Sequence, residues 1–251
     1  MSRRARTVMF LAAALLIGGG LLWGFAGLPR SGDYHGVYGL TMQHIALAQR
    51  HATDLVSTLT FDYRGFDTLG EEFILFVSAT GCAVLLRAQR GERSAERAAQ
   101  DADERAEQVA RPLRALGAAL VGPVLVLGGY VVVHGHLTPG GGFQGGVILA
   151  SGVVLVFIAG HVFALRRVRP LPIVELGEAV GAAGFALIAI GGLIFGVAAL
   201  DNFLPLGAPG ALLSAGMIPL LNVSVGLEVA GAFTLALSEF LDQALLRRVS
   251  Q

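Results

Sequence analysis

The chain of 251 residues is 54% hydrophobic and 14% charged, with a mean hydropathy of +0.68 and a formal net charge of zero. Soluble domains carry about 25% charged residues, so this composition indicates an integral membrane protein. A zero net charge gives no support to nucleic-acid binding, and the single cysteine, Cys82, excludes a disulfide framework or a cysteine-only metal site within one chain.

Six apolar runs follow one another along the chain and predict an all-α, polytopic membrane protein with about six transmembrane helices. The first run is longer than the apolar core of a signal peptide, about 7–15 residues, and is expected to be retained as an anchor. The second is so short, about 21 Å of a roughly 30 Å core, that Glu71 and Glu72 are expected at the hydrocarbon boundary. The six runs are Thr7–Pro29, Phe73–Leu86, Ala115–Val133, Val147–Leu165, Ala179–Leu200 and Met217–Leu237.

Between the first two runs, residues 30–70 contain apolar side chains at helical spacing, beginning at Ile45 and ending at Leu59. This pattern predicts an amphipathic helix that lies along the membrane face or on a neighbouring protein. The alternative is a small loop domain that packs on its own chain.

A charged segment divides the chain into three parts. Residues 87–114 hold seven arginines and six acidic residues and no aromatic residue, which is typical of a solvated helical connector. We therefore expect a two-span module at 1–87, a cytoplasmic linker at 88–111 and a four-span module at 112–251.

The arginines also predict the orientation in the membrane. If the N-terminus is cytoplasmic, fifteen arginines lie on the inside and only Arg30, Arg50 and Arg64 on the outside. The positive-inside rule then favours a multi-pass protein of the cell membrane with both termini in the cytoplasm.

An unusual glycine-rich stretch, residues 134–146, separates the third and fourth runs, and we call it the glycine corner. Five glycines and Pro139 within eight residues are incompatible with a helix interior. We expect a tight turn followed by a helix that begins near Gly145. Irregular backbone at membrane depth needs cover from other protein, so the corner is expected to pack against another segment, for example one of another polypeptide.

Three residues are candidates for proton transfer. Glu228 lies near the middle of the last run, where a charge costs roughly 2.5–3.5 kcal/mol on insertion scales, so it is a candidate proton relay. The structural alternative is a protonated Glu228 hydrogen-bonded to a neighbouring helix, with Ser224 or Asn222 as local partners. His134 and His136 have a suitable pKa range for proton transfer, or else cap helix carbonyl groups. They make a poor metal site, since no carboxylate is near them in sequence.

Other acidic residues have simpler structural explanations. Asp62, Arg64, Asp67 and Glu71 are expected to form a charge-paired cluster, with an ion vestibule as the functional alternative. Acidic side chains at 175 and 178 open the fifth run, where the N-terminus of a helix favours them. Glu228 is thus the one acid expected to be buried within a span.

The glycine corner resembles the signature of the B subunit of Mrp-type multisubunit cation/proton antiporters, the MnhB domain. The likeness covers about Arg111–Val249 and rests on Gly135, His136, Pro139, Gly140, Gly141, Gly142, Phe143, Gly145 and Gly146. One departure is that Ser224 stands where an aspartate is expected in typical B subunits.

The front part resembles the end of the A-type antiporter polypeptide, which is itself similar to the E-type subunit of membrane-bound hydrogenases. The matching residues are Asp62, Arg64, Gly65, Phe66, Asp67, Thr68, Gly70 and Glu71. The linker would then join two pieces that are usually separate.

The two resemblances imply a membrane subunit of a cation (Na⁺)/proton antiporter and no enzyme activity, cofactor or metal. Its implied partners are other subunits of the complex and the lipid bilayer, with Na⁺ and H⁺ as the transported ions. With one buried acid and no intramembrane Lys or Arg, the chain is expected to scaffold and shape an ion route beside larger subunits. Two alternatives are a membrane subunit of a hydrogenase or complex-I-like machine, and a self-sufficient small channel or carrier.

Overall fold

The structure is a computed structural model that describes residues 3–28, 36–86, 111–168 and 171–249. The chain forms two compact units, residues 1–41 and 42–251. The first unit contains α1 (Arg3–Ala26) and the start of α2 (Val37–Arg50). Of the predicted linker, only Arg111 belongs to the described residues, as the first residue of α6.

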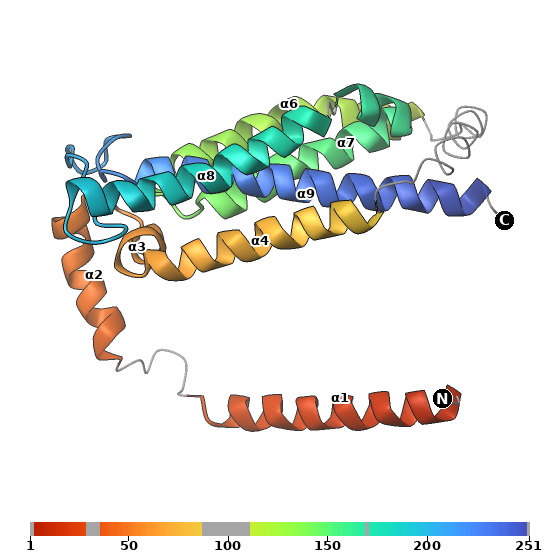
Figure 1. Cartoon of the computed structure of the whole chain (residues 1–251), viewed down its shortest axis with the longest axis horizontal. Helices are drawn as coiled ribbons and strands as arrows, with labels where there is room; N and C mark the ends of the chain where they lie inside the picture. The colour runs from red at the N-terminus through yellow and green to blue at the C-terminus, as the bar shows by residue number, and fades with distance from the viewer. Residues whose placement is uncertain (1–2, 29–35, 87–110, 169–170, 250–251) are drawn as a thin grey trace. The chain divides into compact units, whose positions relative to one another are not determined.

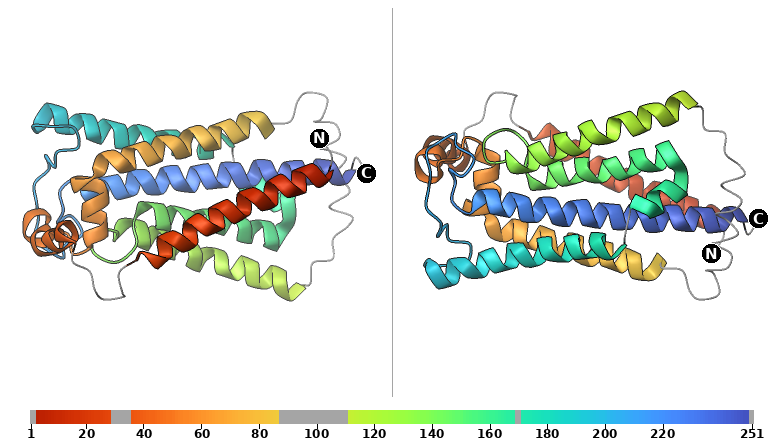
Figure 2. Two further views of the ribbon diagram at one scale, coloured as in Figure 1. Left: turned by 90° about the horizontal axis from the view of Figure 1, so that it is seen from below. Right: turned by 90° about the horizontal axis from the view of Figure 1, so that it is seen from above.

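The second unit is a helical bundle built around one central helix, α9 (Ile218–Val249). Four long helices contact α9: α4, α6, α7 and α8. In Figure 2, α4 and α8 lie on one side of the blue α9, and α6 and α7 lie on the other. Their bounds are Gly65–Leu86 for α4, Arg111–Val133 for α6, Gly142–Val168 for α7 and Leu171–Phe195 for α8.

The helices confirm an all-α polytopic membrane protein. Five described helices are long and apolar enough to cross a membrane: α1, α4, α6, α8 and α9. The described apolar part of α7 is Gly142–Phe157, and the helix continues to Val168. Within the described segments the only β-type pairing is an isolated bridge between Leu206 and Ala215.

The predicted extent of the second span, Phe73–Leu86, is wrong, while the place of Glu71 and Glu72 at the hydrocarbon boundary stays a prediction. Helix α4 begins at Gly65 and is 22 residues long, so its length is not limited to the short apolar run. The charged residues of this segment therefore lie inside the helix. Glu71 is on its exposed side, whereas Glu72 is turned inward and is only 3% exposed.

The predicted continuous amphipathic helix between Ile45 and Leu59 is also wrong. Helix α2 ends at Arg50, and His51 has a positive φ of 53° that reverses the chain. A new short helix, α3 (Leu55–Thr58), starts behind Asp54, whose carboxylate accepts the backbone N–H of Ser57 at 2.7 Å. This N-cap explains why the helix restarts there. A π-turn, η1 (Leu59–Tyr63), follows and leads into α4.

The segment from Ala46 to Phe61 packs on its own chain, as the second sequence alternative proposed. Ala46, Ala52 and Phe61 are at most 5% exposed. Phe61 belongs to the main apolar core with Phe185 of α8 and several residues of α9. Figure 1 shows α3 beside the start of α4, at the same end of the bundle as the loop between α8 and α9.

Helices α8 and α9 approach each other closely because glycines face backbone atoms. A β-carbon on Gly181 would lie 2.6 Å from the carbonyl oxygen of Ser224. A β-carbon on Gly231 would lie 2.9 Å from the backbone nitrogen of Glu178. Small residues at helix interfaces permit this backbone proximity inside membranes.

We predict that Gly181→Ala destabilises the protein by about 1–3 kcal/mol, because the added methyl group overlaps the α9 backbone. The matched control is Gly177→Ala, one turn away on α8, where a β-carbon would meet no atom within 4 Å. The control should be neutral or stabilising, since Ala favours a helix by roughly 1 kcal/mol over Gly. Thermal unfolding in detergent measures both. Equal melting temperatures for the two variants would contradict the close packing.

Candidate functional site

The glycine corner is a tight turn that ends where α7 begins. Gly140 and Gly141 have φ angles of 150° and 131°, which side-chain-bearing residues rarely adopt. Helix α7 starts at Gly142, three residues before the predicted position near Gly145. The tight turn and the helix after it were both predicted from the sequence.

The corner packs against its own chain. A β-carbon on Gly142 would lie 2.7 Å from Cβ of Val225, and one on Gly146 would lie 2.7 Å from Cβ of Val229. On its other side, a β-carbon on Gly145 would lie 2.7 Å from the backbone nitrogen of Val132. The glycines of this motif therefore let α7 touch α6 and α9 at backbone distance, and the cover expected for the corner comes from these two helices.

Asn222 of α9 ties the corner to two other segments. Its side-chain oxygen accepts the backbone N–H of Gly142 at 2.8 Å. Its side-chain nitrogen donates to Oγ of Ser57 at 3.0 Å and to the carbonyl oxygen of Ile218 at 3.1 Å. Asn222 is fully buried, so these bonds satisfy polar groups that would be costly to leave unpaired.

Residues 51–72, which we call the front segment, thus lie directly on the corner. The backbone N–H of Asp54 donates to the carbonyl oxygen of His136 at 3.1 Å. The hydroxyl group of Thr68 on α4 donates to the carbonyl oxygen of Thr60 at 2.7 Å, which holds α4 against the π-turn. These bonds join the piece with the A-type likeness to the piece with the B-type likeness.

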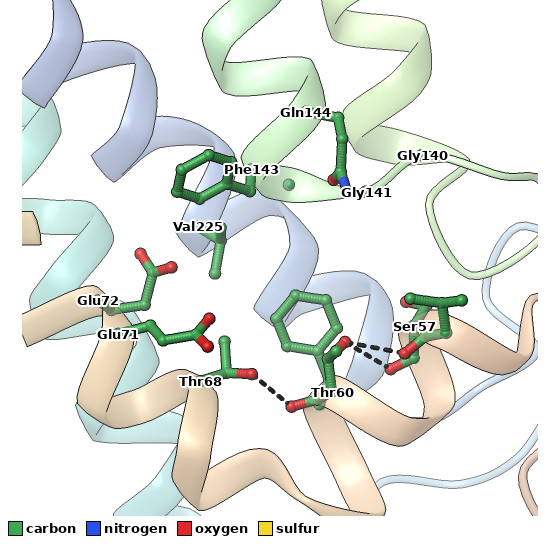
Figure 3. A pocket seen from close by; sticks show the side chains of 13 residues that line it. Ser57, Thr60, Thr68, Glu71, Glu72, Gly140, Gly141, Phe143, Gln144 and Val225 are labelled. Atoms are coloured by element: carbon green, nitrogen blue, oxygen red, sulfur yellow. Dashed lines mark hydrogen bonds between the residues drawn. The ribbon is translucent and has the colours of Figure 1, made fainter. Parts of the chain in front are cut away.

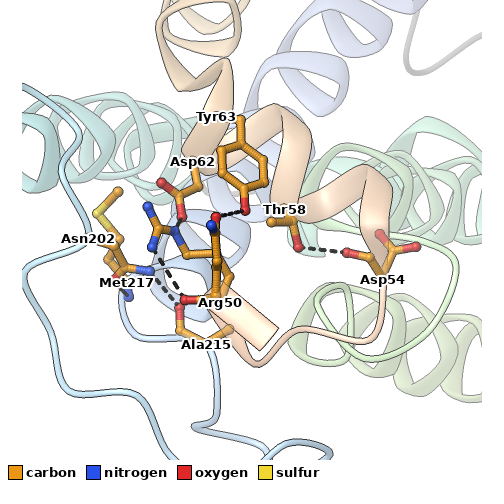
Figure 4. Close-up of polar contacts among 9 residues, drawn as sticks. Arg50, Asp54, Thr58, Asp62, Tyr63, Asn202, Ala215 and Met217 are labelled. Atoms are coloured by element: carbon orange, nitrogen blue, oxygen red, sulfur yellow. Dashed lines mark hydrogen bonds and ion pairs between the residues drawn. The ribbon is translucent and has the colours of Figure 1, made fainter. Parts of the chain in front are cut away.

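The expected charge-paired cluster is divided in two. Arg64 pairs with Asp67, and both side chains are more than half exposed. Asp62 instead forms an ion pair with Arg50 at the end of α2 (Figure 4). Burial raises the pKa of Asp62, and the Arg50 guanidinium opposes this rise. Sequence reasoning missed Arg50, because the partners are twelve residues apart and the turn at His51 brings them together.

A pocket of about 240 Å³ lies where the front segment meets the corner. Figure 3 shows the carboxyl groups of Glu71 and Glu72 on one side of this pocket and Gln144 of the corner across from them. The remaining polar lining comes from Ser57, Thr60, Thr68 and the backbone of Gly140, Gly141 and Gly142. Phe61, Phe143, Val56 and Val225 supply apolar walls. Phe143 is itself held by an edge-to-face contact with Phe233, at 6.2 Å between ring centroids.

The expectation of a single buried acid is wrong, because four glutamates are buried among the described residues: Glu239 near the end of α9, and three others that are linked through Glu228. Glu72 of α4, Glu178 of α8 and Glu228 of α9 are 3%, 2% and 0% exposed. Glu228 interacts with Glu72 and with Glu178. Each of the three carboxyl groups has at least one buried oxygen with no hydrogen-bond partner. The α4, α8 and α9 spans contain no Lys or Arg to balance them.

The two histidines of the corner lie in different surroundings. His134 stacks on Tyr130 at 4.1 Å between ring centroids, and its Nδ1 lies 3.1 Å from the carbonyl oxygen of Tyr130. His136 is fully buried and faces the backbone of Ala211 and Leu212. Burial lowers the pKa of His136.

The remaining residues of the predicted signatures differ in how exposed they are. Gly70 and Pro139 are exposed, and Gly135 is buried against Asn222, whose side-chain oxygen would lie 2.5 Å from an added β-carbon. Among the residues that the structure describes, no group of three or more His, Cys, Asp or Glu side chains is arranged to hold a metal ion.

Together, the corner, the buried carboxyl groups and the membrane helices define a class: a polytopic membrane protein with an acid-lined interior. Residues 112–235 match the family described as a domain related to the MnhB subunit of Na⁺/H⁺ antiporters. This part of the chain is an MnhB domain, and the resemblance predicted from the glycine corner is confirmed.

Two curated relatives are similar to half of the chain or more. An uncharacterized protein of Methanocaldococcus jannaschii is 29% identical over 215 residues, which cover 78% of this chain and 80% of that protein. The A/B subunit of a probable K⁺/H⁺ antiporter of Rhizobium meliloti is 30% identical over 149 residues. That match covers 52% of this chain but only 15% of the relative, and its name fits a junction of A-type and B-type pieces.

Two solved structures share the fold over almost the whole chain. A chain of the membrane-bound sulfane sulfur reductase, an archaeal respiratory membrane complex, superposes with a TM-score of 0.69 at 26% identity. That match covers 94% of this chain and 98% of the other. A chain of the Mrp complex from Dietzia sp. gives a TM-score of 0.70 at 24% identity, over 95% of this chain and 26% of the other.

The lowered pKa of His136 predicts a pH-dependent stability. The unfolded chain binds a proton at this residue near pH 6.5, and the folded chain does so only at lower pH. The free energy of unfolding should therefore fall as the pH drops below about 6.5, and the loss is complete below the folded-state pKa. A polar side chain that does not titrate removes this contribution. His136→Gln should thus show a smaller drop in melting temperature between about pH 7.5 and 5.5 than the parent protein does. An identical drop in both proteins would show that His136 does not contribute.

Proposed function

We propose that this chain is a membrane subunit of a multisubunit cation/proton antiporter, with Na⁺ as the first cation to test. Its MnhB domain and its similarity to the A/B subunit of a probable K⁺/H⁺ antiporter support this function. Other subunits of the complex are its proposed partners, and the two-span, linker and four-span division at 1–87, 88–111 and 112–251 is its proposed organisation.

The observation that carries the proposal is that the pocket between front segment and corner reaches Glu72, which in turn interacts with Glu228. Hydroxyl, amide and carboxyl oxygens line the pocket, as in sites that attract cations. The acids behind it have no basic partner within their spans, so they must carry protons or receive a cation. A site that takes either ion is what proton-coupled cation exchange requires.

Within this function the candidate residues take different roles. Glu228 is the proton relay, because it is fully buried at mid-span and lies next to two other acids. His134 and His136 hold the corner, because their rings contact Tyr130 and the backbone at 211–212. Glu71 and Thr68 line the way to the relay, while Asp62 anchors the front segment through Arg50.

We also propose the orientation that the arginine distribution predicts, with both termini in the cytoplasm and the chain in the cell membrane. The corner, the α8–α9 loop and the 51–57 segment share one end of the bundle, which supports placing all three outside. His51 Nδ1 lies 2.6 Å from the carbonyl oxygen of Gly207, and Asp54 bonds to His136.

Cysteine labelling tests this orientation. In a Cys82→Ala background, an impermeant thiol reagent added outside should modify Ala208→Cys but not Pro112→Cys, because both positions are exposed but lie at opposite ends. Modification of Pro112→Cys alone would invert the topology.

Replacement of Glu228 tests the relay. Glu228→Gln keeps the shape of the side chain but removes the titratable proton, so antiport should fall by roughly 100-fold, the scale of losing a positioned acid–base group. Glu228→Asp should recover part of the rate. Exchange is measured in vesicles with verified subunit levels. Asp201→Asn serves as the control, since an amide oxygen can still accept the backbone N–H of Val197 at 2.9 Å. Normal antiport in Glu228→Gln together with failed assembly of Glu228→Leu would assign Glu228 a structural role.

A second candidate is a membrane subunit of a respiratory redox complex. It is favoured by the match to 98% of a chain of the sulfane sulfur reductase. Purification of the tagged chain from its native membrane, followed by mass spectrometry, separates the two functions. Antiporter-type subunits in the complex support the first, and iron–sulfur or other redox subunits support the second. The third possibility, a self-sufficient carrier, requires cation exchange by the purified chain alone in liposomes.

A further inference from the structure

Three of the buried acids, Glu72, Glu178 and Glu228, are spread along the membrane-spanning direction rather than gathered at one depth. Glu72 lies seven residues after the start of α4, about 10 Å along the helix at 1.5 Å per residue. Glu228 lies ten residues after the start of α9, about 15 Å along it. Both helices begin at the end of the bundle that carries the pocket.

Glu178 approaches from the opposite end. Helix α8 runs antiparallel to α9, and Glu178 lies seven residues after Leu171, about 10 Å from the far end. One turn closer to that end, half-buried Glu175 interacts with Glu178. The order from pocket to far end is therefore Glu72, Glu228, Glu178 and Glu175, with exposed Glu71 beside the pocket.

The helix packing places these side chains in register. The glycines at 181 and 231 bring the α8 and α9 backbones together on either side of the two acids. A β-carbon on Gly231 would lie 2.8 Å from Cβ of Glu178, and the position of Gly181 is directly against the backbone of Glu228. Substituting a larger residue at either glycine would separate the two carboxyl groups.

The environment of the three acids suits proton carriage. Each side chain is at least 97% buried and has at least one oxygen with no hydrogen-bond partner. The acidic neighbours that face these side chains are Glu71, beside Glu72, and Glu175, beside Glu178. No basic residue occurs in the spans of α4, α8 and α9. Acids in such surroundings are costly to ionise together, so protons must be shared among them.

We propose that Glu72, Glu228 and Glu178 form a proton-conducting file that crosses this chain from the pocket to the far membrane face. In each step the O–H bond of a protonated carboxyl group breaks as an O–H bond forms on the next carboxylate, directly or through one water molecule. One proton is taken up from water in the pocket at Glu72 and one is released past Glu178 and Glu175. No other atom or electron is transferred.

The proposal rests on the antiporter function but goes further, because it gives this chain a complete proton route of its own. The sequence predicts only one buried acid and hence a scaffold. If the file exists, Glu178 is as necessary for proton movement as Glu228, although it lies on a different helix and far from the glycine corner.

The test measures proton flux separately from cation flux in liposomes that contain the complex with this full-length chain, using a pH dye inside the liposomes. Glu178→Gln should lower proton flux about 100-fold, to the level of Glu228→Gln, and Glu178→Asp should restore part of it. Asp201→Asn, an acid outside the file, should retain the parent rate. Normal proton flux in Glu178→Gln while Glu228→Gln is inactive would overturn the file and leave the antiporter proposal intact.

Infrared difference spectroscopy gives a readout that does not require transport. On a pH jump, the purified full-length chain should show C=O bands of protonated, buried carboxyl groups that shift in heavy water. Single Gln substitutions at 72, 178 and 228 should each remove part of this signal. An unchanged spectrum in all three variants would show that these groups do not exchange protons and would overturn the proposal.

Discussion

The hydrogen bond from the backbone N–H of Gly142 to the side chain of Asn222 fixes the arrangement on which the candidate site depends. It joins the first residue of α7 to the central helix, at the point where the chain leaves the positive-φ backbone of Gly140 and Gly141. The same Asn222 side chain bonds to Ser57, so one fully buried amide positions three segments. In an apolar interior, such a bond favours one packing arrangement of the helices, because any other arrangement would leave buried polar groups without hydrogen-bond partners.

These hydrogen bonds create a polar pocket between the front segment and the glycine corner, two parts of the chain that resemble different antiporter subunits. The front segment supplies hydroxyl and carboxyl groups, and the corner supplies backbone amides and Gln144. The glycines of the corner are needed because α7 touches both neighbours at backbone distance. The family signature is therefore explained by packing, whereas the chemistry comes from acids that lie on α4, α8 and α9.

Much of the fold could be predicted from the sequence because membrane helices and glycine turns are local patterns. The all-α class, the turn at 134–141 and the MnhB likeness follow from apolar runs and from one unusual motif. The start of α4 could not be predicted from hydropathy, because the helix begins at Gly65 but the uncharged run begins only at Phe73. The charged residues Asp67, Glu71 and Glu72 lie in between. The meeting of the buried acids was concealed for a different reason. Glu178 stands near a helix start, where an acid needs no special explanation, and the face of α8 that turns toward α9 depends on tertiary packing at Gly181.

The central claim is that the pocket between front segment and corner is part of the ion route. It is tested most directly by modifying Thr60→Cys, which lines the pocket, with a bulky thiol reagent in a Cys82→Ala background during cation/proton exchange. The account predicts that exchange stops in proportion to the modified fraction, while the same reagent on Thr53→Cys, an exposed position outside the pocket lining, has no effect. Unchanged exchange by a complex whose Thr60→Cys is fully modified would contradict the account.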